Sequence, residues 1–137
     1  MIKKYYLNTE SLPVIPTPHD WVINKIEANS EFLIFYLEDT GINYNGEPPH
    51  DFAPNSKSLI MRLHLEDPVF EAYKWKKSVS GKGFFEIDAN KLLAIPKKHT
   101  LEYLYHYVGY NTIIIKLYQL GHILLDISAD YVELEWL

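Results

Sequence analysis

Two short loops of this chain each carry a histidine followed directly by an aspartate, a combination that can ligate a metal ion. The pairs are His19-Asp20 and His50-Asp51, and each lies between a proline and an aromatic residue. Neutral imidazole and carboxylate ligands suit zinc or iron. One pair supplies only two ligands, whereas a catalytic site needs at least three. A metal-dependent enzyme would therefore have to bring both loops together.

The local pattern also contains reasons against this metal site. If His19 and Asp20 lay on a strand, their side chains would point to opposite faces and would not easily hold one ion. The helical spacing H-E-x-x-H is absent. The alternative is that each aspartate makes a local turn bond and each histidine packs on its proline.

Three tyrosines alternate along the segment 101–108 and form the second conspicuous group. On a strand, Tyr103, Tyr105 and Tyr107 would share one face, with Leu104 and His106 on the other. Such a row could stack a sugar or an apolar ligand, or form an aromatic face for a protein partner. It could equally pack a half-buried part of the sheet.

Acidic side chains gather near the C-terminus, although the net charge of the whole chain is only −5. Residues 101–137 hold five acids and one base, whereas residues 57–98 hold nine bases and five acids. Period-two alternation predicts that Asp126, Glu133 and Glu135 lie on a solvated face, opposite residues such as Val132 and Leu134. Such a face would suit a basic protein partner and disfavours a general nucleic-acid surface.

The sequence lacks the residues and motifs that other common kinds of catalysis require. The chain has no cysteine, which excludes a disulfide framework and thiolate catalysis. The glycine-rich and nucleophile-elbow motifs of nucleotide-binding proteins and hydrolases are absent as well. We therefore assign no catalytic residue and expect no cofactor.

The elements that would position these residues are strands. The segment 100–137 reads as four consecutive strands with alternating apolar residues, joined by connections of two or three residues. Such short connections predict an antiparallel meander. The last of these turns is expected at Ala129-Asp130.

The rest of the chain predicts further strands and one short helix. Strands are expected over 21–28, 31–39, 58–66, 69–78 and 83–87. The lysines of 69–78 are typical of an edge strand. Asp88 can cap a helix that would run from Ala89 to Ile95 and stop at Pro96.

These elements favour one all-β domain over residues 1–137. The expected architecture is an antiparallel β-sandwich or a curved, partly closed sheet of eight to nine strands. No stretch is long and apolar enough for a membrane span, and no signal-length apolar run is present. We expect a cytoplasmic protein of unknown oligomeric state.

The segment His19-Asp20-Trp21-Val22-Ile23, followed by a hairpin strand over 32–39, resembles a loose group of small bacterial β-proteins. Some members of that group resemble immunity proteins of toxin systems. The resemblance covers about 20 residues closely and the remainder only in layout, and it brings no activity with it. Small size, acidity concentrated on one sheet, abundant tyrosine and the lack of a catalytic motif favour a protein-interaction module. The leading hypothesis is thus an inhibitor or immunity protein. A small-ligand-binding β-protein and a metal-dependent enzyme remain alternatives.

Overall fold

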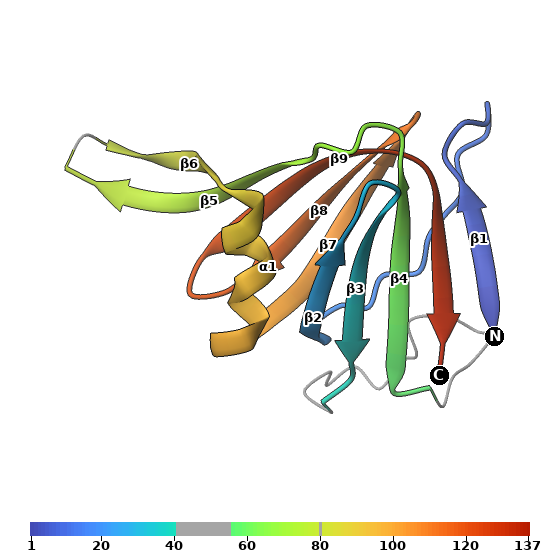
Figure 1. Ribbon diagram of the computed structural model, residues 1–137, viewed down its shortest axis with the longest axis horizontal. Helices are drawn as coiled ribbons and strands as arrows, with labels where there is room; N and C mark the ends of the chain where they lie inside the picture. Colours follow the sequence, from blue (N-terminus) through green and yellow to red (C-terminus); the bar gives the residue numbers. More distant parts are fainter. Residues whose placement is uncertain (41–55, 80) are drawn as a thin grey trace.

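The computed structural model describes residues 1–40, 56–79 and 81–137, and it contains an antiparallel sheet and one short helix (Figure 1). The predicted fold class is confirmed. In the described part of the chain the elements are β1 Ile2–Tyr6, β2 Val22–Ala28, β3 Phe32–Glu38, β4 Ser58–Leu65, β5 Glu71–Ser78, β6 Gly81–Ile87, α1 Ala89–Lys98, β7 Leu101–Gly109, β8 Thr112–Tyr118 and β9 His122–Trp136.

Strand β9 organises the sheet because two different sets of strands pair with its two halves. Its first half lies between β8 and β5, and its second half lies between β1 and β4. The order along the sheet is β4-β3-β2-β7-β8-β9-β5-β6, and β9 returns to pair with β4. The expected C-terminal meander is therefore present as β7-β8-β9.

The predicted turn at Ala129-Asp130 is wrong, because the chain continues through it as one strand. His64 pairs with Tyr131, whereas Leu65 pairs with Ala129, so Asp130 is an extra residue in β9. A bulge of this kind bends a strand and increases its twist. The bend lets β9 pass from one set of neighbours to the other, which a hairpin turn would not allow.

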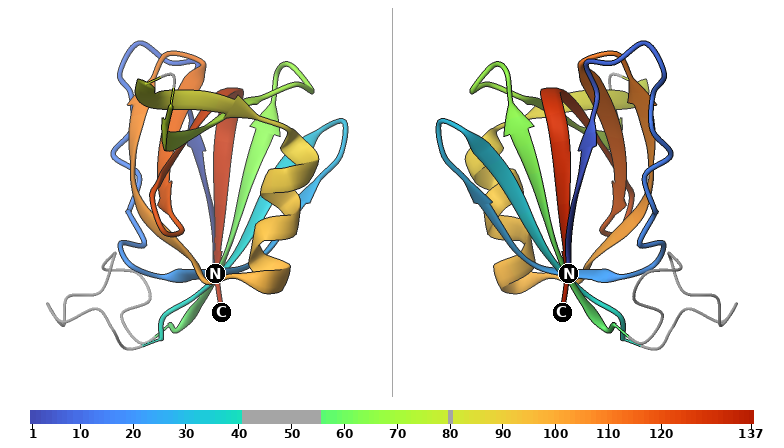
Figure 2. Two further views of the ribbon diagram at one scale, coloured as in Figure 1. Left: turned by 90° about the vertical axis from the view of Figure 1, so that its left-hand side faces the viewer. Right: turned by 90° about the vertical axis from the view of Figure 1, so that its right-hand side faces the viewer.

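The sheet is partly ring-like and only loosely closed, so the curved sheet is the observed one of the two expected architectures (Figure 2). Strands β2 and β7 pair through Val22 and Ile23 only. Helix α1 packs against β2 next to this short pairing and buries Leu92 completely. The helix thus covers core that β2 and β7 leave open.

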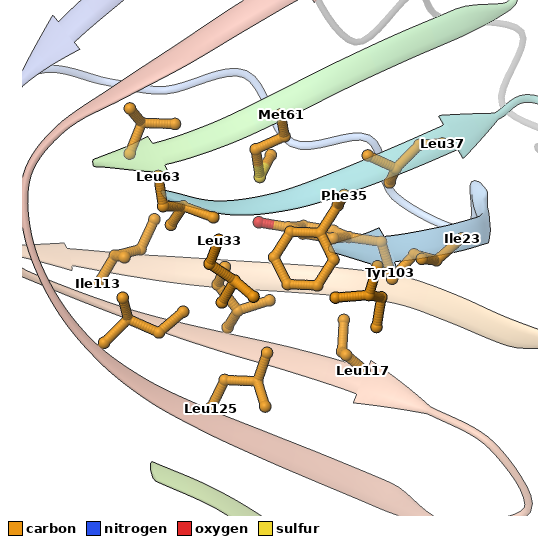
Figure 3. Packing of buried hydrophobic residues seen from close by; sticks show 14 of the residues in the cluster. Ile23, Leu33, Phe35, Leu37, Met61, Leu63, Tyr103, Ile113, Leu117 and Leu125 are labelled. Carbon is orange, nitrogen blue, oxygen red and sulfur yellow. The ribbon is translucent and has the colours of Figure 1, made fainter. Parts of the chain in front are cut away.

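Apolar side chains from the concave side of the strands fill the interior (Figure 3). The strand predicted over 58–66 is confirmed as β4, and its alternate residues Leu59, Met61, Leu63 and Leu65 are all buried. The same holds for the inward residues of β8 and of both halves of β9. Burial of a leucine-sized side chain contributes about 1.5–3 kcal/mol, so this layer carries much of the stability.

The helix begins as predicted and ends later than predicted. The Asp88 carboxylate accepts a hydrogen bond from the Asn90 N–H at 2.7 Å, which is an N-cap. Pro96 lies inside the helix, which continues to Lys98. A proline this close to the C-terminus removes only one backbone hydrogen bond, and the His99 N–H still reaches the Ile95 carbonyl at 2.9 Å.

The prediction that residues 69–78 form the edge strand is also wrong. Strand β5 lies between β9 and β6, and β6 is the last strand in the order. Only residues 71–74 of β5 pair with β9, whereas the pairing with β6 continues through Ser78. The outer part of this hairpin therefore extends away from the rest of the sheet (Figure 1).

Candidate functional site

The pair His19-Asp20 lies in a turn before β2, so the expectation that the two side chains point apart on a strand is wrong. Asp20 has a φ of 65°, a left-handed conformation that brings its carboxylate to 3.3 Å from Nε2 of His19. On the other side of the ring, Nδ1 donates to the Leu104 carbonyl at 2.6 Å. These contacts fix the turn on β7.

The shared metal site receives no support from the described residues. His50 and Asp51 lie outside them, so their distance from His19 is not defined. Among residues 1–40, 56–79 and 81–137, no group of three or more histidine and carboxylate side chains is placed to hold a metal ion.

The three tyrosines of β7 do not share a face, which corrects the predicted row. Tyr103 pairs with Leu117 and Tyr105 pairs with Lys116, so Leu104 is an extra residue that reverses the alternation. Tyr103 is completely buried, as Figure 3 shows, whereas Tyr107 is 53% exposed. A continuous stacking platform along this strand therefore does not exist.

Tyr103 instead belongs to a buried hydrogen-bond chain. Its hydroxyl lies 2.6 Å from Nδ1 of His106, and Nε2 of His106 lies 3.0 Å from the Ile15 carbonyl. A carbonyl can only accept, so Nε2 carries the proton and Nδ1 accepts from Tyr103. Burial lowers the pKa of His106, and burial raises the pKa of Tyr103. The chain ties the N-terminal segment to β7.

The other two tyrosines form a small polar group on the outside. The rings of Tyr105 and Tyr107 meet edge to face at 5.3 Å, and the Lys116 ammonium lies 3.3 Å from the Tyr105 hydroxyl. The hydrogen bonds from Tyr107 and Lys116 lower the pKa of Tyr105, while the bond to Tyr105 raises the pKa of Tyr107. This group is an ordinary exposed cluster on β7 and β8.

Glu133 and Glu135 lie opposite the buried Val132 and Leu134, as predicted, but they are only partly exposed because both bind the same arginine. Arg62 lies on the adjacent strand β4, with Nη1 at 3.0 Å from Glu133 and Nη2 at 2.8 Å from Glu135. The side chains of Arg62, Glu133 and Glu135 are 26%, 18% and 25% exposed. Burial alone would lower the pKa of Arg62, but its bonds to the two carboxylates hold it above the ordinary value. Asp126 is exposed in the first half of β9, away from this network.

A row of four rings crosses the same sheet next to the arginine network. Tyr6, Tyr131, His64 and Phe32 stand side by side on β1, β9, β4 and β3. Successive ring centroids lie 5.8, 4.7 and 5.0 Å apart, and His64 stacks on Tyr131 at an interplanar angle of 9°. The Asp130 carboxylate lies 2.6 Å from Nδ1 of His64 and orients its ring.

These residues belong to the convex side of strands β1, β9, β4 and β3, which we call the outer sheet face. Its members are Ile2, Lys4, Tyr6, Phe32, Ile34, Tyr36, Ile60, Arg62, His64, Tyr131, Glu133 and Glu135. Each of these side chains is partly or fully exposed. Seven of the twelve are isoleucine, tyrosine or phenylalanine, and no described element packs over them.

Sequence reasoning overlooked most of this face. Ile60, Arg62 and His64 alternate with the buried residues of β4, and their types match no motif. The signal was the adjacent strand β3, whose residues are apolar on both faces. That pattern favours a strand buried on both sides, whereas one side of β3 is open in the described structure.

Comparison of the chain with protein-family models, with curated proteins and with solved structures finds no match in any of the three. The resemblance to small bacterial β-proteins therefore stays an expectation. The single described helix is too short to cross a membrane.

Proposed function

We propose that this protein is a protein-interaction module of the inhibitor or immunity type, and that a partner protein docks on its outer sheet face. The observation that carries the proposal is the aromatic and aliphatic character of this face. Contiguous exposed apolar surface marks interaction sites, and tyrosine anchors dominate the energetics of many interfaces. The fixed ring row of Tyr6, Tyr131, His64 and Phe32 would lose little side-chain entropy on binding.

Lys4 and Arg62 match Glu133 and Glu135 in number on the outer sheet face, so a basic contact of the partner is favoured at the glutamate pair and not by the face as a whole. Glu133 and Glu135 share one guanidinium, so this partly buried group carries one more negative than positive charge. A lysine or arginine of the partner would supply the missing cation, and the arginine network would hold the two carboxylates in place for it. The proposal includes a cytoplasmic location, in keeping with a chain that has no cysteine.

The proposal is tested by capturing proteins from the source cells at low ionic strength and reconstituting any complex from purified components. We expect a 1:1 complex that weakens with salt, because its charged contacts are screened. Ile60→Glu places a charge on the face, between Tyr36 and Glu135 of the neighbouring strands. Val14→Glu is the matched control at a site that is 92% exposed on the N-terminal segment.

In the reconstituted complex, Ile60→Glu should weaken binding at least tenfold, as loss of one interface anchor costs about 1–2 kcal/mol or more. Val14→Glu should leave the affinity unchanged. Charge reversal at Glu135 should weaken binding more at low salt than at high salt. A partner that binds Ile60→Glu and wild type equally would show that the outer sheet face is not the docking surface.

A further inference from the structure

The hairpin formed by β5 and β6 exposes aromatic side chains on both of its faces. Phe84 and Phe85 are neighbours on β6, so they point to opposite faces, and they are 44% and 42% exposed. Trp75 lies opposite Phe84 on β5, is 43% exposed, and contacts the Phe84 ring at 5.4 Å. Large apolar residues rarely stay bare on both faces of one ribbon.

The outer edge of this hairpin is open in the described part of the chain. Strand β6 ends the sheet order, and β5 is its only described neighbour. An exposed edge strand presents backbone N–H and C=O groups to any further strand. Five of the seven residues of β6 are exposed, namely Gly81, Lys82, Phe84, Phe85 and Glu86.

The sequence of β6 is complementary to itself when it is read in the opposite direction. Lys82-Gly83-Phe84-Phe85-Glu86 carries a cation at one end and an anion at the other. In an antiparallel pair centred on Phe84, Lys82 of each strand stands opposite Glu86 of the other. A parallel pair would place Lys82 against Lys82 and Glu86 against Glu86, which is unfavourable.

We infer that β6 pairs antiparallel with β6 of a second copy of this chain, with Phe84 on the two-fold axis. The pairing would join the two hairpins into one four-stranded ribbon, β5-β6-β6-β5. It is an isologous interface, in which each copy contributes the same residues. The inference is independent of the outer sheet face, which involves none of these residues.

The pairing would also cover apolar surface on both faces of the ribbon. On one face, Trp75 and Phe84 of the two copies form a row of four rings across four strands. On the other face, Phe85 of one copy stands opposite Gly83 of the other. A side chain added at Gly83 would meet nothing within 4 Å, so the Phe85 ring has open space to occupy.

The charge distribution favours a second copy over a nucleic acid as the occupant. Lys76, Lys77 and Lys82 make the outer part of the hairpin basic, which by itself would also suit a polyanion. The whole chain, however, has a net charge of −5, so the rest of the molecule repels a polyanion. In the self-pair, Glu86 of the second copy neutralises Lys82, and the acidic remainders of the two copies stay away from each other.

The inference is tested by sedimentation velocity over a concentration series, with charge exchange at the two ends of β6. A contact of one strand pair is small, so wild type should dimerise weakly, in the roughly micromolar range. Lys82→Glu should weaken dimerisation about tenfold, because the two-fold axis makes each substitution act twice. Glu86→Lys should do the same. The double variant Lys82→Glu/Glu86→Lys should restore it.

Restored dimerisation in the double variant is the decisive result. If β6 paired with a different surface, exchanging the two charges within β6 would not restore the affinity. Lys91→Glu, on the exposed side of α1, has the same net charge as Lys82→Glu and should leave dimerisation unchanged. Amide hydrogen exchange of Phe84 and Phe85 should slow as concentration rises.

Three results would overturn the inference. The first is a protein that stays monomeric at all concentrations up to about 1 mM, which excludes even weak pairing. The second is that the single variants dimerise like wild type. The third is that the double variant dimerises as weakly as the single variants. Binding of wild type to a mixed-sequence oligonucleotide at physiological salt, with loss of that binding in Lys82→Glu and no dimer, would assign the hairpin to nucleic acid instead.

Discussion

The buried chain Tyr103–His106–Ile15 predicts how much stability one hydroxyl contributes. Tyr103→Phe keeps the ring in the core and removes only the group that donates to Nδ1 of His106 at 2.6 Å. The imidazole nitrogen of His106 is then left without its partner at a partly buried site. Loss of one partner of a buried hydrogen bond costs about 1–3 kcal/mol. With a urea slope of about 1–3 kcal/mol per molar, the unfolding midpoint should fall by roughly 1 M.

The same chain gives a pH dependence whose sign follows from His106. Its pKa is lowered from the ordinary value of 6.5 by burial, so the folded state resists protonation more than the unfolded state does. Well above pH 6.5 the imidazole is neutral in both states, and the contribution to stability is fully present. As the pH falls below that value, the unfolded state binds the proton first and the free energy of unfolding decreases.

Two comparisons separate this contribution from other effects. Tyr107→Phe is the same substitution on the same strand at an exposed site, and it should change the free energy of unfolding by less than about 0.5 kcal/mol. The stability difference between wild type and His106→Gln should narrow between pH 7 and pH 5 in urea titrations. Equal midpoints for Tyr103→Phe and Tyr107→Phe, or a difference that does not change with pH, would refute the reasoning.

Three other substitutions test separate parts of the fold by urea unfolding. Arg62→Met leaves Glu133 and Glu135 close together without their cation, so the free energy of unfolding should fall by about 1–3 kcal/mol. Replacing both glutamates by glutamine in the same variant should recover part of that loss. Asp88→Ala removes the N-cap of α1 and should cost about 1 kcal/mol, whereas Asp88→Asn should cost less. Leu120 has a φ of 52° and is exposed, so Leu120→Gly should stabilise by about 0.5–1 kcal/mol, and a loss of stability would contradict the assigned strain.

The period-two pattern was sufficient to predict which residues of the regular strands are buried. Leu59, Met61 and Leu63 of β4 alternate with polar or exposed residues, and all three lie in the core. The N-cap at Asp88 was equally readable, because it depends on residues next to each other in the chain. Patterns of this kind can be predicted from the sequence because the interactions that cause them are between residues close together in the chain.

The outer sheet face was not readable in the same way, because it depends on which strands become neighbours. The sequence shows Arg62 and Glu133 as separate charges 71 residues apart, and only the pairing of β4 with β9 joins them. The open side of β3 is likewise a property of the assembled sheet. Glu133 and Glu135 were chosen as partner-binding residues for their exposure, whereas the structure places them in a shared and partly buried network.

Two of the failed predictions, the turn at Ala129-Asp130 and the tyrosine row of 101–108, have the same physical cause, which is a β-bulge whose extra residue binds the N-terminal segment. The extra residue in a bulge lies outside the ladder, so its carbonyl is available to another group. In β9, the Asp130 carbonyl accepts from the Leu7 N–H at 2.8 Å. In β7, the Leu104 carbonyl accepts from Nδ1 of His19 at 2.6 Å. A turn at Asp130 and an unbroken alternation through Leu104 were reasonable for each strand alone, but both positions are bound by a segment about 85 to 125 residues away in the chain.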